Sequence, residues 1–257
     1  MKTALITGAT SGIGYEFCRL FAKDKINLFL VSRNSEKLEE IKQNLETEFA
    51  ISVGYYSADL SVQKNVEAFL QHIEQQNIKV DFLINNAGFG DFGKFIKRDI
   101  KKFREMIALN INALTELTYF FAAKMKNNDG GKILNVASIA SLCPVPFMAV
   151  YGATKAYVLS FSNAIYREFK KSNVRVTALL PGPTDTNFFN AADCINVKMI
   201  NMAMSPQAVA KAGYKAMMKG KMQVIAGMQN KILGFFQKII PTNNLVLAIA
   251  EKMTKNR

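Results

Sequence analysis

The stretch Thr7-Gly8-Ala9-Thr10-Ser11-Gly12-Ile13-Gly14 decides the fold, because it joins a short apolar run to a helical pattern near the start of the chain. Its glycines allow a tight turn and a close approach of the backbone to a pyrophosphate. A helix that begins here also offers unpaired N–H groups to an anion. The spacing is not GxGxxG, and no Gly-Lys-Ser/Thr follows, so a P-loop is not supported. A plain strand–helix corner is the alternative, but the position at the first such turn favours cofactor binding.

The rest of the chain alternates short apolar runs with helical patterns, which is typical of a parallel sheet flanked by helices. The predicted strands span residues 4–6, 28–31, 51–57, 80–84, 133–136, 174–180 and 223–226. The predicted helices span residues 13–23, 35–49, 62–76, 103–126 and 151–171. Right-handed crossovers between such strands give an α/β fold, a Rossmann-type doubly wound sheet of about seven strands. Because the sequence shows no linker or repeat, we predict a single domain over residues 1–257.

Composition narrows the class of protein. Of the 257 residues, 49% are apolar, which suffices for a sizeable core, and the net charge is +13. The lysines are scattered rather than gathered in a long basic run, which disfavours nucleic-acid binding. Cys18, Cys143 and Cys194 form no CxxC pair, and His72 is the single histidine, so no metal site or disulfide framework is predicted. A reducing cytoplasmic compartment fits these cysteines, and neither a secretory signal nor an apolar run of about 20 residues is evident.

The end of the second predicted strand bears on the choice of cofactor. Dinucleotide-binding proteins that prefer NAD usually carry a carboxylate here for the ribose 2′-hydroxyl. This sequence has Ser32 and Arg33 instead, and an arginine can pair with a 2′-phosphate. A solvated arginine at a helix start is the alternative. The missing acid and the present base together favour NADP(H) over NAD(H).

Several motifs, in this order along the chain, resemble those of the short-chain dehydrogenase/reductase family. The turn from Thr7 to Gly14 resembles TGxxxGxG, Asn85-Asn86-Ala87-Gly88 resembles NNAG, and Tyr151 with Lys155 resembles YxxxK. The resemblance covers nearly the whole chain. It implies catalytic roles for Asn110, Ser138, Tyr151 and Lys155. It also implies that the cofactor contacts Thr7, Gly8, Ser11, Gly12, Ile13, Gly14, Ser32, Arg33, Asp59, Leu60, Asn86, Ala87, Gly88, Tyr151, Lys155, Pro181, Gly182, Thr184 and Thr186.

The spacing of the predicted catalytic residues suits acid–base chemistry. Tyr151 and Lys155 are four residues apart and share one helix face. We expect the ammonium to lower the tyrosine pKa from about 10, so that Tyr151 exchanges a proton with the substrate oxygen. Ser138, at the end of the fifth predicted strand, can bind that oxygen as charge develops. The resemblance implies that Lys155 also holds the nicotinamide ribose and that Asn110 holds a water.

These residues predict an oxidoreductase that moves hydride between nicotinamide and a carbonyl or secondary alcohol. The alternative is a catalytically silent NADP(H)-binding regulatory or interaction protein on the same fold. The intact set of Ser138, Tyr151 and Lys155 favours the enzyme. The resemblance further implies a homodimer or homotetramer formed through the helices at 103–126 and 151–171.

Apolar residues surround the predicted site and suggest a lipophilic substrate, such as a 3-oxoacyl compound or a ketone. They are Phe89, Phe92, Leu142, Pro144, Val145, Pro146, Phe147 and Met148, and in the segment 184–204, a predicted substrate flap, Phe188, Phe189, Ile195, Val197 and Met199. Packing against one another or a second subunit is the alternative. Cys143 is a further candidate for the pocket lining. The mixed apolar and basic extension at 221–257 closes the pocket, joins a subunit interface or lies on an anionic membrane, and the first two are favoured.

Overall fold

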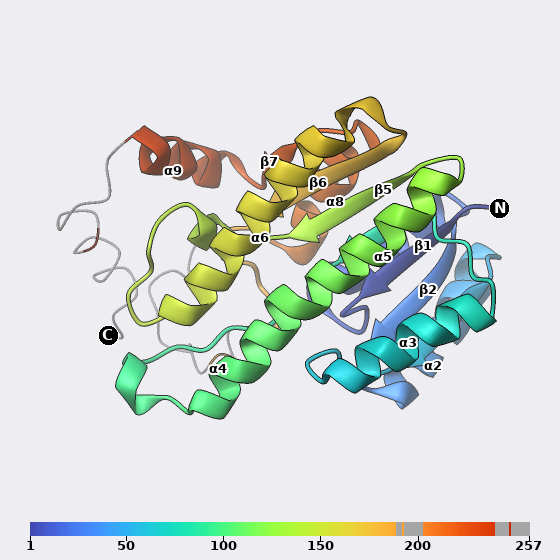
Figure 1. Ribbon diagram of the computed structural model, residues 1–257, viewed down its shortest axis with the longest axis horizontal. Helices are drawn as coiled ribbons and strands as arrows, with labels where there is room; N and C mark the ends of the chain where they lie inside the picture. The colour runs from blue at the N-terminus through green and yellow to red at the C-terminus, as the bar shows by residue number, and fades with distance from the viewer. Residues whose placement is uncertain (189–191, 193–202, 240–246, 248–257) are drawn as a thin grey trace.

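Seven parallel strands form one sheet in the order β3-β2-β1-β4-β5-β6-β7, as the computed structural model shows (Figure 1). The structure describes residues 1–188, 192, 203–239 and 247. The strands are β1 (Thr3–Thr7), β2 (Asn27–Ser32), β3 (Val53–Ser57), β4 (Phe82–Asn85), β5 (Gly131–Val136), β6 (Val174–Leu180) and β7 (Gln223–Ile225). Because every pair of neighbours is parallel, all carboxyl ends lie at one edge. The predicted α/β class and doubly wound sheet are confirmed.

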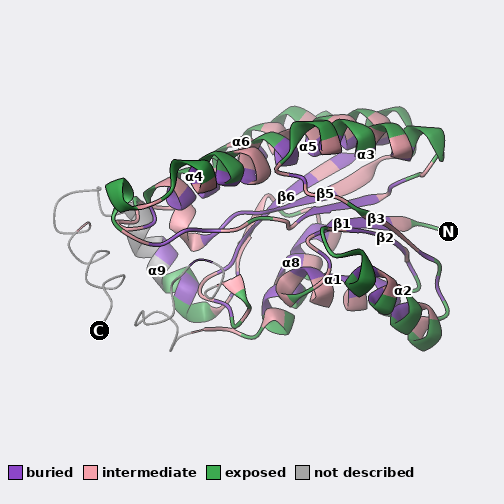
Figure 2. Ribbon diagram, turned by 90° about the horizontal axis from the view of Figure 1, so that it is seen from below, coloured by how far each residue is buried: buried purple, intermediate pink, exposed green. Residues whose placement is uncertain are grey.

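Helices cover both faces of the sheet. In Figure 2, α3, α4, α5 and α6 lie on one face, and α1, α2 and α8 lie on the other. The helices are α1 (Gly12–Lys23), α2 (Ser35–Phe49), α3 (Gln63–Gln75), α4 (Ile100–Ile107), α5 (Leu114–Asn127), α6 (Ala149–Glu168), α8 (Pro206–Met218) and α9 (Met228–Ile239).

Each face of the sheet has its own apolar core. Phe17 and Phe21 of α1 are fully buried on one face, and Phe69 of α3 and Phe121 of α5 are buried on the other. Burial of one such side chain stabilises the fold by about 1.5–3 kcal/mol. The strands between the two cores are apolar on both sides, as in Leu28-Phe29-Leu30-Val31, which explains why they appear as continuous apolar runs.

The helix predicted over 103–126 differs from expectation in two ways. It begins at Ile100, because the Asp99 carboxylate accepts a hydrogen bond from the Lys101 N–H at 2.9 Å and caps the helix. It is also interrupted by a π-helical stretch, Ala108–Ala113, between α4 and α5. By length and composition alone the run Ile100–Asn127 could span a membrane, contrary to the expectation that no such apolar run is present. In the structure its apolar face packs into the cores through Met106, Leu117 and Phe121, among others.

Other boundaries shift by a few residues. Strand β3 begins at Val53 rather than 51, and α6 spans Ala149–Glu168 rather than 151–171. The two ends of the predicted flap meet, since Thr184 bridges to Met204 and the Asp185 N–H donates to the Met204 carbonyl at 2.9 Å. Positions 189–191 and 193–202 of that flap lie outside the described residues. The same holds for 240–246 and 248–257 of the predicted extension.

Candidate active site

The turn after β1 lies where the strand order reverses, between β1 and β4, which is where ligands bind in such sheets. Gly8 adopts φ +65°, and a Cβ on Gly14 would lie 2.1 Å from the Gly8 carbonyl oxygen, so both positions require glycine. Helix α1 then begins at Gly12. Its N-cap residue, Ser11, makes no side-chain cap, and its first turn holds no acidic residue. The first N–H groups of α1 can therefore receive a phosphate.

A clasp joins this turn to the segment after β4. The Thr7 hydroxyl accepts hydrogen bonds from the N–H groups of Asn86 at 3.0 Å and Ala87 at 2.9 Å. In return the Asn86 side-chain amide donates to the carbonyls of Thr7 at 3.0 Å and Gly8 at 3.1 Å. Thr7 is 1% exposed, so its side chain supports the turn from behind.

Ser138, Tyr151 and Lys155 converge at the carboxyl end of β5. Ser138 follows β5 directly, and one turn of α6 separates Tyr151 from Lys155. The Lys155 ammonium donates to the Val136 carbonyl at 2.8 Å and lies 5.9 Å from the centroid of the Tyr151 ring. The Ser138 hydroxyl accepts from the Ala140 N–H at 3.1 Å and hydrogen-bonds with the Tyr151 phenol. None of the three is more than 9% exposed.

Burial dominates the acid–base properties of this group. It raises the pKa of Tyr151 to about 12, and the hydrogen bond with Ser138 only partly offsets it. Burial also lowers the pKa of Lys155 to about 8. The expectation of a lowered tyrosine pKa is therefore wrong for this structure, because the loss of hydration at the phenolate outweighs the hydrogen bond with Ser138. At neutral pH Tyr151 is a protonated phenol and can act as a proton donor.

Asn110 lies in the π-helical stretch and is fully buried. Its amide donates to the Phe89 carbonyl at 3.0 Å and to the Thr154 hydroxyl at 3.1 Å, and its oxygen accepts from the Phe89 N–H at 3.2 Å. A Cβ on Gly88 would lie 2.8 Å from the Asn110 Oδ1 and 3.4 Å from the Lys155 Nζ. Asn110 thus ties α6 to the segment after β4 beside the catalytic group.

One cavity of about 1020 Å³ runs over these groups. Most of the residues predicted to bind the cofactor line it: Gly8, Ser11, Gly12, Ile13, Ser32, Arg33, Asp59, Leu60, Asn86, Ala87, Gly88, Tyr151, Lys155, Pro181, Gly182, Thr184 and Thr186. Ser138 lines it as well, whereas Thr7, Gly14 and Asn110 support the lining from behind. A Cβ on Gly12 would lie 2.8 Å from the Thr186 methyl group, so the glycine keeps the cradle open. These features fit a dinucleotide.

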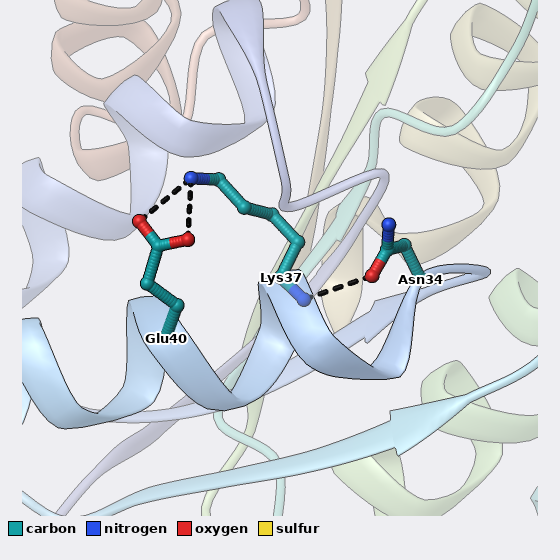
Figure 3. Close-up of polar contacts among 3 residues, drawn as sticks. All are labelled: Asn34, Lys37 and Glu40. Carbon is teal, nitrogen blue, oxygen red and sulfur yellow. Dashed lines mark hydrogen bonds and ion pairs between the residues drawn. The ribbon is translucent and has the colours of Figure 1, made fainter.

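The far end of the cavity bears on cofactor choice. Arg33 is exposed there, and the hydroxyls of Thr10 and Ser32 lie 2.9 Å apart beside it. The next cation, Lys37, is paired with Glu40 at 2.7 Å, while its N–H donates to the Asn34 cap at 2.8 Å (Figure 3). Lys37 is thus held along α2, whereas Arg33 lines this end of the cavity.

The end of the cavity near Tyr151 is apolar. The ring of Phe188 lies 5.3 Å from the Tyr151 ring, and a Cβ on Gly90 would lie 2.6 Å from the Phe188 Cζ. Further lining comes from Phe89, Ala140, Cys143, Val145 and Met148. Phe92 and Phe147 belong to the same apolar cluster, and their ring centroids lie 5.9 Å apart. The predicted lining residues Phe189, Ile195, Val197 and Met199 lie outside the described residues.

Two sets of residues at the site are not marked by any of the sequence motifs. Thr154 holds Asn110 and donates to the Tyr151 carbonyl at 2.8 Å, but only its place next to Lys155 could have indicated this. Lys101, Glu105 and Leu109 line the cavity from α4 and the stretch after it. Their spacing of four residues places them on one helix face, a signal that was available in the sequence.

Comparison with known proteins agrees with this geometry. Residues 2–194 match the sequence profile described as short chain dehydrogenase. The chain belongs to the short-chain dehydrogenase family. Among solved structures, a short-chain dehydrogenase from Sphingobium yanoikuyae in complex with NADPH superposes with a TM-score of 0.83 and 27% identity, over 95% of this chain and 98% of that one.

The names of two similar proteins state a substrate. A 7beta-hydroxysteroid dehydrogenase of Mediterraneibacter gnavus is 28% identical over 88% of this chain and 86% of its own length. A very-long-chain 3-oxoacyl-CoA reductase-B of Danio rerio is 31% identical over 70% of this chain and 58% of its own length. As a short-chain dehydrogenase, this protein is an oxidoreductase of a family that acts on alcohols and ketones.

Proposed function

We propose that this protein is an NADP(H)-dependent enzyme that interconverts a lipophilic ketone, such as a 3-oxoacyl compound, and its secondary alcohol. The observation that carries the proposal is the convergence of Ser138, Tyr151 and Lys155 in one large cavity beside a glycine-rich turn. When bound, the nicotinamide supplies or accepts the hydride.

Each of the three side chains has a distinct role in this proposal. Tyr151, with a pKa of about 12, is protonated at neutral pH and gives its proton to the substrate oxygen during reduction. Ser138 donates a hydrogen bond to the same oxygen as negative charge develops. Lys155, fixed by the Val136 carbonyl, places a positive charge beside the phenol and stabilises the phenolate that remains.

The preference for NADP(H) rests on Arg33. The end of β2 offers no carboxylate to a ribose 2′-hydroxyl, and Lys37 is paired with Glu40. Arg33 makes no ion pair with the described residues and is exposed at the cavity. An arginine beside a phosphate forms strong charge-assisted hydrogen bonds, and a 2′-hydroxyl gains no such bond.

The preference for a lipophilic substrate rests on the aromatic and aliphatic lining around Tyr151. An apolar ligand that displaces water from such a surface binds favourably, because apolar area is removed from water. The names of the steroid dehydrogenase and the 3-oxoacyl-CoA reductase point to the same class. We further propose that the protein acts in the cytoplasm as a homodimer or homotetramer. We propose that its partner is a small-molecule substrate bound in the cavity and not a nucleic acid.

The proposal is tested first by fluorescence titration with NADPH and NADH. We expect tighter binding of NADPH, and we expect Arg33→Asp to weaken NADPH binding at least about tenfold while NADH binding is retained. Lys37→Asp is the matched control, since Lys37 does not line the cavity, and it should leave the preference intact. Equal binding of both cofactors by the wild type would remove the NADP(H) preference. Binding of neither would favour the alternative of a regulatory protein that does not catalyse hydride transfer.

A screen of carbonyl compounds then tests the substrate class. We expect a higher kcat/KM for lipophilic ketones and 3-oxoacyl compounds than for small hydrophilic ketones. Equal values for the two groups would contradict the proposed class while leaving the oxidoreductase intact. NADPH binding without turnover of any carbonyl or alcohol would favour the silent binding protein.

A further inference from the structure

An exposed apolar and basic surface lies at one end of the molecule, beyond the carboxyl ends of the strands. It is formed by the short helix η1 (Phe95–Lys97) and helix α4, which lie together at the lower left of Figure 1. We name residues 94–107 the tip segment. Four of its large apolar side chains are exposed to solvent, with exposed fractions of 60% for Phe95, 85% for Ile96, 57% for Ile100 and 41% for Ile107.

The tip segment is held in place by a buried carboxylate. The side chain of Asp91 is fully buried and pairs with Arg98 at 2.7 Å and with Lys102 at 2.7 Å. Burial alone would raise the pKa of Asp91, but the two cations more than offset it and hold the pKa below its usual range. Gly93 has φ +148°, and a Cβ there would lie 2.6 Å from the Arg98 Cδ.

Aromatic packing adds to this anchorage. The Phe95 ring stacks on Phe103 with centroids 5.5 Å apart and an angle of 11°. Phe103 itself is 7% exposed and belongs to the core around Tyr151. The exposed apolar residues are therefore presented on an anchored element, so their exposure is a property of the fold.

The charge of the tip segment indicates what would cover it. It contains six lysines and arginines and two acids, Asp99 and Glu105. Lys94, Lys97, Lys101 and Arg104 are exposed around the apolar residues. A second copy of the chain related by a two-fold axis at residues 94–100 would bring the same cations together, which opposes self-association there. The proposed subunit interface uses the helices at 103–126 and 151–171 instead. Exposed apolar side chains interspersed with exposed cations along one segment instead suit a lipid surface with anionic headgroups.

The tip segment also borders the cavity. Asp99, Lys101, Lys102 and Glu105 line the cavity, while Phe95, Ile96 and Ile100 are exposed to solvent. One short element thus has one side at the cavity and another at the proposed lipid surface.

We propose that the tip segment docks on the surface of an anionic lipid bilayer. Phe95, Ile96 and Ile100 enter the headgroup layer, and Lys94, Lys97 and Arg104 contact lipid phosphates and carboxylates. Docking brings the mouth of the cavity to the bilayer, where lipophilic compounds concentrate. The proposal differs from membrane contact by the C-terminal extension, because it assigns the contact to residues of η1 and α4. It does not depend on the reaction that the cavity supports.

The test is cosedimentation of the full-length protein with vesicles. We expect binding to vesicles of phosphatidylcholine with phosphatidylserine, weaker binding to phosphatidylcholine alone, and release at high salt. Ile96→Glu should weaken vesicle binding more than about tenfold, since the isoleucine side chain that the proposal places in the headgroup layer is lost. Lys94→Gln with Lys97→Gln should weaken it by about fivefold for each lysine.

Ile232→Glu in α9 is the matched control, because Ile232 is 54% exposed and the same substitution is made outside the tip segment. It should leave vesicle binding unchanged, and NADPH titration checks that every variant is folded. Loss of binding in Ile232→Glu but not in Ile96→Glu would assign the contact to the C-terminal extension and overturn the proposal. No binding by the wild type would also overturn it. So would a change from dimer to monomer on Ile96→Glu without vesicle binding, which would identify a second copy as the partner.

Discussion

Replacement of Thr7 by valine tests whether the clasp between the first turn and the segment after β4 holds the cofactor site together. Valine keeps the shape of threonine but removes the hydroxyl that accepts from the N–H groups of Asn86 at 3.0 Å and Ala87 at 2.9 Å. The Asn86 N–H also donates to the Ile84 carbonyl at 3.1 Å, so the Ala87 N–H is the group that loses its acceptor. A buried N–H left without an acceptor costs about 1–3 kcal/mol. Thr7→Val should therefore lower the free energy of unfolding by about 1–3 kcal/mol and should weaken NADPH binding as the turn loosens.

The matched variant is Thr7→Ser, which keeps the hydroxyl and removes only a methyl group. It should cost about 1 kcal/mol and should retain NADPH affinity. The assay is urea unfolding of both variants and the wild type, followed by NADPH titration of each. If Thr7→Val were as stable as Thr7→Ser and bound NADPH equally well, the clasp would not have the role that the geometry assigns to it.

Three further substitutions probe burial, charge and packing. The pKa of Lys155 is about 8 in the folded protein and 10.5 in the unfolded chain, so the unfolded chain binds more protons between pH 8 and pH 10.5. The free energy of unfolding of the wild type, relative to that of Lys155→Met, should therefore rise with pH in this range. A difference in urea unfolding that does not change with pH would contradict this prediction. Asp91→Asn should lower stability by about 3 kcal/mol because it removes the buried charge that pairs with Arg98 and Lys102, whereas Asp129→Asn, 93% exposed, should not change stability; equal effects would refute the anchoring role of Asp91. Gly14→Ala should abolish NADPH binding, since its Cβ would lie 2.1 Å from a carbonyl oxygen, but Gly152→Ala, with its nearest atom at 3.6 Å, should bind normally; NADPH binding by Gly14→Ala would show that the turn can adjust.

Elements with a strong local pattern are predictable from the sequence. The helix predicted over 35–49 and the strand predicted over 174–180 have the same bounds as α2 and β6. Helix α2 has an asparagine cap and a regular apolar stripe, and β6 is an apolar-rich strand that ends in Ala178-Leu179-Leu180 and is bounded by a proline at 181. The glycine-rich turn is predictable for the same reason, because only glycine suits its backbone and its close contacts.

Features set by tertiary contacts are not predictable in this way. No side-chain pattern marks the π-helical stretch at 108–113, because it accompanies the contacts of Asn110 with Phe89 and Thr154, which are distant in sequence. The raised pKa of Tyr151 likewise depends on how deeply the folded chain buries it. The motif gives the distance between Tyr151 and Lys155 but not their hydration, which is why the direction of the tyrosine shift was predicted wrongly.

Hydride transfer by Tyr151→Phe tests the central claim most directly. Tyr157→Phe is the matched control, since Tyr157 lies on the same helix but is 37% exposed and bonds with the Thr115 hydroxyl at 3.0 Å. With a lipophilic ketone and NADPH, we expect Tyr151→Phe to lose about 10²–10⁴-fold in kcat and to bind NADPH as tightly as the wild type. Tyr157→Phe should react like the wild type. Unchanged kcat in Tyr151→Phe would contradict the assignment of Tyr151 as the proton donor.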